Sequence, residues 1–363
     1  MPSKALLLVH GMGNHTAPTA DARGSFGRQV IDTCNLALKR YPKHQGKGIE
    51  DYVDIVEFNY NKWFDEVRAR MKEKADSVHK RLSGIAGHYN VTFPIDLVGE
   101  LASLESKFGN NTFFYTHWLD VIFYSTILGA KVRVDAGREV ARLVAKYGAG
   151  NVHVMAHSLG SAVMHDTLSL LYRPETDLED EIPDLSITNH KLASVWMVAN
   201  VSRLLNAATK LSDPLRSVVK PGDDGCAIVF NSVRHELDPF TWVSRFSPKN
   251  NGKWVSEYAY DAYYLDIVNS LVTNGDTHDI TQYLEDPNVS EALFSQIFKL
   301  KASNTDLEKA REQYRKKSIQ GAYALLETEF KDLKIRGFES WQDFFSAGKG
   351  LSGAIKLIKE QLP

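Results

Sequence analysis

The sequence predicts an α/β fold in which helices flank a mostly parallel central sheet. Short apolar runs recur along the chain, and segments with helical periodicity separate them, as in successive βαβ units. The first of these runs, residues 5–9, is continuously apolar, which is typical of a strand buried on both faces of a parallel sheet. With 363 residues, the chain can form one large α/β domain with insertions.

Five segments are predicted as strands, and helical spacing is found between them. The strands are expected at residues 5–9, 51–58, 152–155, 194–200 and 226–231. Helical spacing covers residues 26–41, 62–83, 113–128 and 132–147, and the chain reads as helical from about residue 287 onward. In a parallel sheet of this kind, the functional site is expected at the carboxyl ends of the strands.

Composition excludes several classes of protein. The hydrophobic share of 43%, the charged share of 24% and the net charge of −2 are those of an ordinary globular protein without a basic field for nucleic acid. Cys34 and Cys226 are the only cysteines, which excludes a zinc-type cysteine cluster and fits a reducing compartment. Neither a leader pattern nor an apolar run of about 20 residues is present, so we expect a cytoplasmic protein.

The segment around Ser158 has the pattern of a strand that turns sharply into a helix. Ser158 lies between the small residues Ala156 and Gly160, directly after the apolar strand. In a nucleophile elbow the serine has a strained backbone, so small residues two positions away let strand and helix pass closely. The usual pattern has glycine at both places, and Ala156 departs from it by one methyl group. The pattern predicts Ser158 as a nucleophile.

A glycine turn at residues 10–13 follows the first predicted strand. Such a turn can present a backbone N–H to a developing oxyanion, together with the N–H after the nucleophile. The expected donors are Met12 and Leu159, and Gly11, Gly13 and His157 are candidate substrate contacts. The alternatives are an ordinary glycine turn and, for His157, a packing role.

An acid and a base are expected after Ser158 in the chain, because a serine hydroxyl needs an imidazole to take its proton and a carboxylate to orient that imidazole. Asp238 follows the strand at 226–231 and precedes a proline that restrains the loop. His278 lies in a polar loop before a helix. The order serine, aspartate, histidine is that of one large class of hydrolases.

Other residues compete for these roles. His235 is an alternative base, and Asp261, Asp266 and Asp279 are alternative acids. His10 and His15 suggest a metal site, but no carboxylate or thiolate cluster accompanies them. We therefore predict no metal and no cofactor.

These features together resemble the α/β-hydrolase-fold serine hydrolases of the lipase and esterase type. The resemblance is carried by residues 10–13, residues 156–160, Asp238 with Pro239, and His278, and spans roughly residues 4–285. More locally, residues 156–166 and 230–239 are similar to segments of intracellular phospholipases of the DDHD type. The resemblance implies an α/β-hydrolase fold and cleavage of a carboxylic ester, lipid-like or with a short acyl chain, through an acyl-enzyme.

The expected organisation is a catalytic domain at residues 1–286, with a helical cap inserted at 62–128, and a helical extension at 287–363. Apolar residues of the cap, such as Leu97 and Leu101, are expected either to line an acyl pocket or to pack between helices. The segment 350–362 has an apolar stripe that can contact a membrane surface, the domain or another subunit. The oligomeric state stays open.

Two classes of function remain. The first is an enzyme that acts on a small-molecule ester or lipid, with thioesterase, lactonase, amidase and acyltransferase activities as variants of the same acyl-enzyme chemistry. The second is a hydrolase-fold protein that binds a ligand without turnover. The presence of a serine, an acid, a base and both oxyanion turns favours the enzyme.

Overall fold

In the computed structural model, six strands form one parallel sheet. The structure describes residues 2–12, 25–73, 120–121, 123–173, 185–242, 244–249, 252–274 and 276–319, together with residues 182, 324 and 327. The strand order is β2-β1-β3-β4-β5-β6, and every neighbouring pair is parallel. The strands are β1 (Ala5–Val9), β2 (Asp54–Phe58), β3 (Val152–His157), β4 (Leu192–Val198), β5 (Ala227–His235) and β6 (Tyr264–Asn269). The predicted α/β class with a parallel sheet is confirmed.

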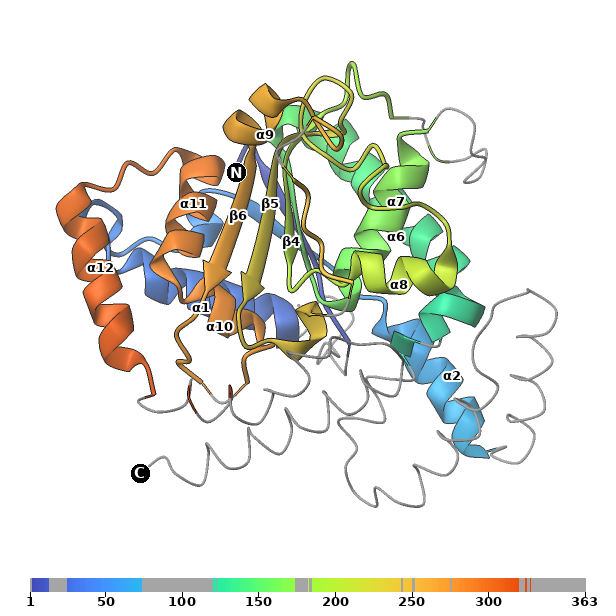
Figure 1. Ribbon diagram of the computed structural model, residues 1–363, viewed down its shortest axis with the longest axis horizontal. Coiled ribbons are helices and arrows are strands. Elements are labelled where there is room, and N and C mark those ends of the chain that lie inside the picture. Colours follow the sequence, from blue (N-terminus) through green and yellow to red (C-terminus); the bar gives the residue numbers. More distant parts are fainter. Residues whose placement is uncertain are drawn as a thin grey trace.

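Helices cover both faces of this sheet. In the described part of the chain they are α1 (Ser25–Leu38), α2 (Asn61–Glu73), α6 (Gly129–Tyr147), α7 (Leu159–Leu171), α8 (Ser202–Thr209), α9 (Glu257–Tyr263), α10 (Ile280–Leu284), α11 (Pro287–Phe298) and α12 (Asn304–Lys317). A π-helical turn, Tyr124–Leu128, precedes α6. Figure 1 shows α6, α7 and α8 on one side of the strands, and α1, α10, α11 and α12 on the other.

The central strand β1 buries side chains on both faces, which explains its continuous apolar run. In β1, Leu7 and Val9 belong to the core cluster beneath α6 and α7, whereas Leu6 and Leu8 belong to the cluster beneath α1 and α11. All five residues of β1 are fully buried. Because successive side chains of a strand point to opposite faces, a polar residue in β1 would face one of the two cores.

The edge strand β6 is missing from the sequence prediction. All five predicted strands are present, but the aromatic run at 258–265, expected to be structural, is mostly helix α9 and only its end enters β6. Leu265, Asp266 and Val268 are exposed on this strand. An edge strand with exposed positions needs no continuous apolar run, so the pattern that identifies central strands does not find it.

The predicted boundary at residue 286 does not coincide with a break in the hydrophobic core. Helix α11 begins at Pro287, and its Leu293 and Phe294 pack in the same cluster as Leu6 and Leu8 of β1. Of the predicted cap, α2 and the turn before α6 belong to the described chain, whereas Leu97 and Leu101 lie outside the described residues. The segment 350–362 lies outside them as well.

No helix of the described residues is both long enough and apolar enough to cross a membrane. The most apolar helices, α7 and α11, instead bury their side chains against the sheet. Their length is 13 and 12 residues, short of the about 20 that a bilayer requires.

Leu293→Ala tests whether α11 belongs to the core. We expect the free energy of unfolding to fall by about 2–5 kcal/mol, because the leucine is fully buried and its loss leaves a cavity. Leu36→Ala on α1 is the matched control, since Leu36 is 52% exposed and its loss should cost less than about 0.5 kcal/mol. Denaturant titration of both variants measures the difference, and equal stability would contradict the packing of α11.

Candidate active site

Ser158 occupies a strained turn between β3 and α7. Its backbone angles are φ 53° and ψ −124°, and its side chain is buried. A positive φ is uncommon for a residue with a side chain, and such strain clusters at functional sites. Ser161 holds the turn in place, because its Oγ donates to the Ser158 carbonyl oxygen at 2.6 Å and accepts the Val201 N–H at 2.9 Å.

Two glycines allow the chain to pass closely around Ser158. A Cβ placed on Gly160 would lie 2.4 Å from the His10 carbonyl oxygen and 2.6 Å from that of Val9. A Cβ on Gly11 would lie 2.7 Å from the Cβ of Ser158. All three distances are shorter than a van der Waals contact, and the two from Gly160 show that the end of β1 and the first turn of α7 touch backbone to backbone.

His278 and Asp238 form a hydrogen-bonded chain with Ser158. His278 Nε2 lies 2.7 Å from Ser158 Oγ, and His278 Nδ1 lies 2.8 Å from Asp238 Oδ2. When Nδ1 carries the proton and donates a hydrogen bond to the carboxylate, Nε2 is left to accept a hydrogen bond from the Ser158 hydroxyl. The structure thus brings together three residues that are 40 and 120 positions apart in the sequence.

The loops that carry His278 and Asp238 are themselves hydrogen-bonded. The His278 N–H donates to Asp276 at 2.9 Å, and Asp279 caps the start of α10 by accepting the Thr281 N–H at 2.7 Å. Asp238 is fully buried at the start of a 3₁₀ turn, Pro239–Thr241, where its Oδ1 accepts the Phe240 N–H at 3.0 Å. Each side chain therefore projects from a fixed backbone.

Carboxylates around His278 raise the pKa of its imidazole. Burial lowers this pKa, but the nearby charges of Asp238, Asp276 and Asp279 and the hydrogen bond to Asp238 outweigh the effect of burial. The pKa of Asp276 is itself raised, mainly by burial. The surroundings of His278 thus stabilise an imidazolium, the form that a base acquires when it accepts a proton.

The competing residues lie elsewhere. His235 is buried, accepts the Leu237 N–H on Nδ1 and hydrogen-bonds the Leu271 carbonyl oxygen through Nε2, and burial lowers its pKa. Asp266 pairs with Arg234, and Asp261 is exposed on α9. Of the four aspartates considered for the acid, Asp238 is the one with a hydrogen bond to His278.

Tyr60 holds the turn that follows β1, and sequence reasoning did not single it out. Its hydroxyl donates to the carbonyl oxygens of His10 at 2.8 Å and Gly11 at 2.9 Å, and its ring stacks on that of His10. Tyr60 is fully buried and lies two residues after β2. In the sequence, the only sign of its role is an aromatic residue shortly after a predicted strand. Met12 follows this anchored turn, and Gly13 and His15 lie outside the described residues.

Leu159 begins helix α7 directly after Ser158. The first N–H groups of a helix have no acceptor within the helix and are oriented toward its amino end. The amino end of α7 lies against the turn at Gly11, as the contacts of Gly160 with Val9 and His10 require.

His157 packs beneath the His278 loop. Its ring stacks on Phe26 with the centroids 6.0 Å apart, and its Nε2 lies 2.8 Å from the His278 carbonyl oxygen. The ring of His157 also contacts that of Tyr283 edge to face. His157 thus packs between α1, the His278 loop and α10.

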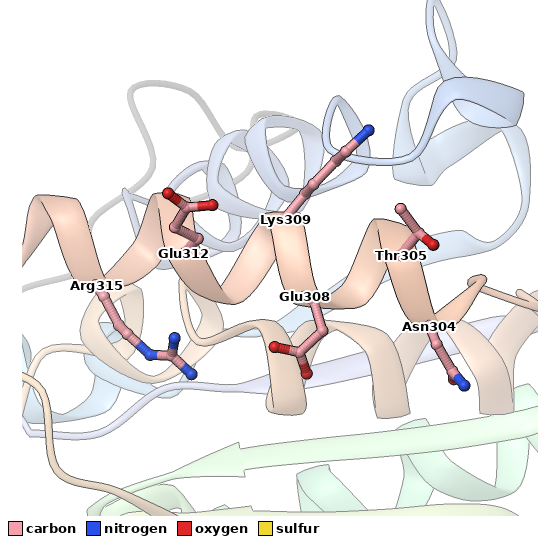
Figure 2. Close-up of a pocket in the computed structure, with 6 residues that line it drawn as sticks. All are labelled: Asn304, Thr305, Glu308, Lys309, Glu312 and Arg315. Carbon is pink, nitrogen blue, oxygen red and sulfur yellow. The ribbon is translucent and has the colours of Figure 1, made fainter.

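Other parts of the described chain contain one similar buried contact, in which His165 Nε2 lies 2.9 Å from Ser217 Oγ and Nδ1 lies 3.4 Å from Asp166 Oδ1, but Ser217 does not have the positive φ of Ser158. They contain no group of three or more histidines, cysteines, aspartates or glutamates that could hold a metal ion. A surface depression lies on α12, and Figure 2 shows the residues that line it. Two of them are in ion pairs on the same helix, Glu308 with Arg311 and Glu312 with Lys316. The lining of the depression is exposed and polar and contains no serine or histidine: Asn304, Thr305, Glu308, Lys309, Glu312 and Arg315.

Gly160→Ala tests the close passage at the nucleophile turn. The added methyl group would collide with two backbone carbonyls, so we expect the free energy of unfolding to fall by about 1–3 kcal/mol or more. The control is Gly150→Ala, where an added Cβ meets nothing within 4 Å. Thermal and denaturant unfolding of both variants provide the measurement, and a Gly160→Ala protein as stable as the control would rule out the contact.

Comparison of the chain with protein-family models, with curated proteins and with solved structures finds no match. Sequence relatives therefore assign no chemistry to these residues. What the site can do follows from its geometry: a buried serine on a strained turn, an imidazole in hydrogen-bond contact with it, and a buried carboxylate on the other side of that imidazole.

Proposed function

We propose that the protein is a serine hydrolase of the α/β-hydrolase type that cleaves a carboxylic ester through an acyl-enzyme on Ser158. The observation that carries the proposal is the hydrogen-bonded chain from Ser158 through His278 to Asp238 on a strained strand-to-helix turn. Serine, base and acid in this contact order are what activation of a hydroxyl requires. Their order along the chain also agrees with that of α/β-hydrolases.

In the proposed reaction, His278 Nε2 takes the proton of the Ser158 hydroxyl as Oγ attacks the ester carbonyl carbon. The negative charge that develops on the carbonyl oxygen is stabilised by the backbone N–H groups of Leu159 and Met12. The bond to the alcohol oxygen then breaks, and His278 donates its proton to this leaving group. A water molecule, deprotonated by His278, releases the acyl group as a carboxylic acid and restores the Ser158 hydroxyl.

Asp238 supports both halves of this cycle. It holds the proton on Nδ1, so that Nε2 is free to act as the base, and its charge stabilises the imidazolium formed after proton transfer. The local similarity to phospholipases favours a lipid-like or short acyl ester as the substrate. A fluorophosphonate probe distinguishes this enzyme from a protein that only binds a ligand, because only an activated serine reacts with the probe.

Ser158→Ala should abolish hydrolysis of simple aryl esters and labelling by the fluorophosphonate. We expect kcat to fall by about 10³-fold or more, because the substitution removes the nucleophile and leaves only the oxyanion donors and binding. Asp238→Asn should lower kcat strongly as well, since the amide stabilises neither the required tautomer nor the imidazolium.

The matched control for the acid is Asp261→Asn, because Asp261 is exposed on α9 and has the same side chain. It should retain the wild-type rate. A Ser158→Ala protein with wild-type turnover would refute the proposed nucleophile. An Asp261→Asn protein less active than Asp238→Asn would refute the proposed acid.

The pH dependence distinguishes His278 from His235 as the base. Only the neutral imidazole accepts a proton, so kcat/KM should fall as the pH is lowered through the pKa of the base. For His278 this pKa is raised above 6.5, and for His235 it is lowered below 6.5. Rates measured with an uncharged ester should therefore show an acid limb with its midpoint above 6.5, and a midpoint below it would contradict the assignment to His278.

A further inference from the structure

Tyr283 of α10 makes a direct contact with the carboxylate of Asp238. Its hydroxyl donates to Asp238 Oδ2 at 2.6 Å. The same oxygen accepts His278 Nδ1 at 2.8 Å, while Oδ1 accepts the Phe240 N–H at 3.0 Å. Asp238 thus has a donor on each oxygen, and one oxygen is shared between His278 and Tyr283.

Burial keeps Tyr283 protonated and in place. The side chain is fully buried, and burial followed by the charge of Asp238 raises its pKa well above the usual value for a tyrosine. The hydroxyl therefore keeps its proton and donates a hydrogen bond throughout the neutral range. The ring also contacts those of His157 and His235 edge to face, which fixes the position of the hydroxyl.

The short helix α10 couples this donor to the base. His278 lies two residues before α10, and Tyr283 lies on the helix five positions after His278. Asp279 caps the helix between them by accepting the Thr281 N–H. The loop before α10 and the helix itself thus supply the two groups that bind Asp238 Oδ2, so the spacing between His278 and Tyr283 is set by local backbone geometry.

From this geometry we infer that Tyr283 is a positioning residue, which fixes the orientation of the Asp238 carboxylate and draws part of its charge away from His278. The inference rests on the proposed hydrolase function. Without the hydroxyl, His278 would be the only side-chain donor to Oδ2 among the described residues. Without the Tyr283 hydroxyl, the Asp238 anion is less stabilised and interacts more strongly with the protonated imidazole of His278. The pKa of His278 should therefore rise. The carboxylate could also rotate, which would weaken the alignment of the imidazole.

Several ionisable groups face His278, and each must stay unchanged for the test to be clear. They come from the loop after β5, from β3 and from the loop of His278 itself: Asp238, His157, Asp276 and Asp279. His235 of β5 contacts the ring of Tyr283. Tyr283→Phe removes one hydroxyl and alters none of the other groups.

The experiment compares Tyr283→Phe with wild type and with Tyr172→Phe. Tyr172 is the matched control, because it is also buried and its hydroxyl donates to the His190 carbonyl oxygen at the same distance of 2.6 Å. We expect Tyr283→Phe to lower kcat about tenfold with KM within about twofold, as for the loss of one hydrogen bond to a charged group. The midpoint of the acid limb should shift upward by several tenths of a pH unit, and Tyr172→Phe should change neither quantity.

Two further measurements separate positioning from stability. An NMR titration of the His278 imidazole in both proteins detects the same upward shift without any turnover. Fluorination of the Tyr283 ring keeps the side chain nearly the same size but makes its hydroxyl a stronger donor, so the midpoint should then shift downward. This second change keeps the inference testable if the phenylalanine variant does not fold.

A Tyr283→Phe protein with the wild-type kcat and pH profile would overturn the inference. A lower kcat with an unchanged midpoint, or with a midpoint shifted downward, would also overturn it, because a purely structural role leaves the titration of His278 unaltered. If wild type neither hydrolyses esters nor reacts with the fluorophosphonate, the proposed function fails. The NMR titration still decides whether Tyr283 controls the proton affinity of His278.

Discussion

The close passage of β1 past the first turn of α7 is the constraint on which the site depends. Gly160 lies against the carbonyls of Val9 and His10, and Gly11 lies against Ser158, so a side chain at either glycine would force the two segments apart. This contact forces Ser158 into a positive φ, since the chain must turn within one residue from a central strand to a buried helix. The surrounding core supplies the free energy that maintains this strain.

Parallel strand order brings the rest of the site to the same place. The strands β3, β4, β5 and β6 are neighbours and point in one direction. The loops that follow β3, β5 and β6 therefore all leave the sheet on the same side, at the carboxyl ends of the strands. Ser158, Asp238 and His278 each lie in one of these loops. Burial then makes the contacts mutually dependent, because an ionised Asp238 without its donors would be an unpaired charge inside the protein.

The central strands could be predicted from the sequence because burial on both faces leaves a local record, namely a continuous apolar run such as Ala5–Val9. The edge strand β6 leaves no such record, because Leu265 and Val268 are exposed. The turn at Ser158 was also predictable, since the need for small residues beside it is satisfied within the segment from Ala156 to Gly160. The packing of α11 in the same core could not be predicted, because helical periodicity does not indicate which surface a helix packs against.

What the sequence determined by itself is local: which segments become central strands, where the chain turns sharply at Ser158, and which acids and bases lie in loops that follow. Tertiary structure decided which of them meet. Asp238 contacts His278 whereas Asp261 and Asp266 do not, and Tyr60, His157 and Tyr283 act on the site from three different elements. The physical reason is that contacts between residues 40 to 120 positions apart depend on strand order and loop path, and neither has a periodic pattern in the sequence.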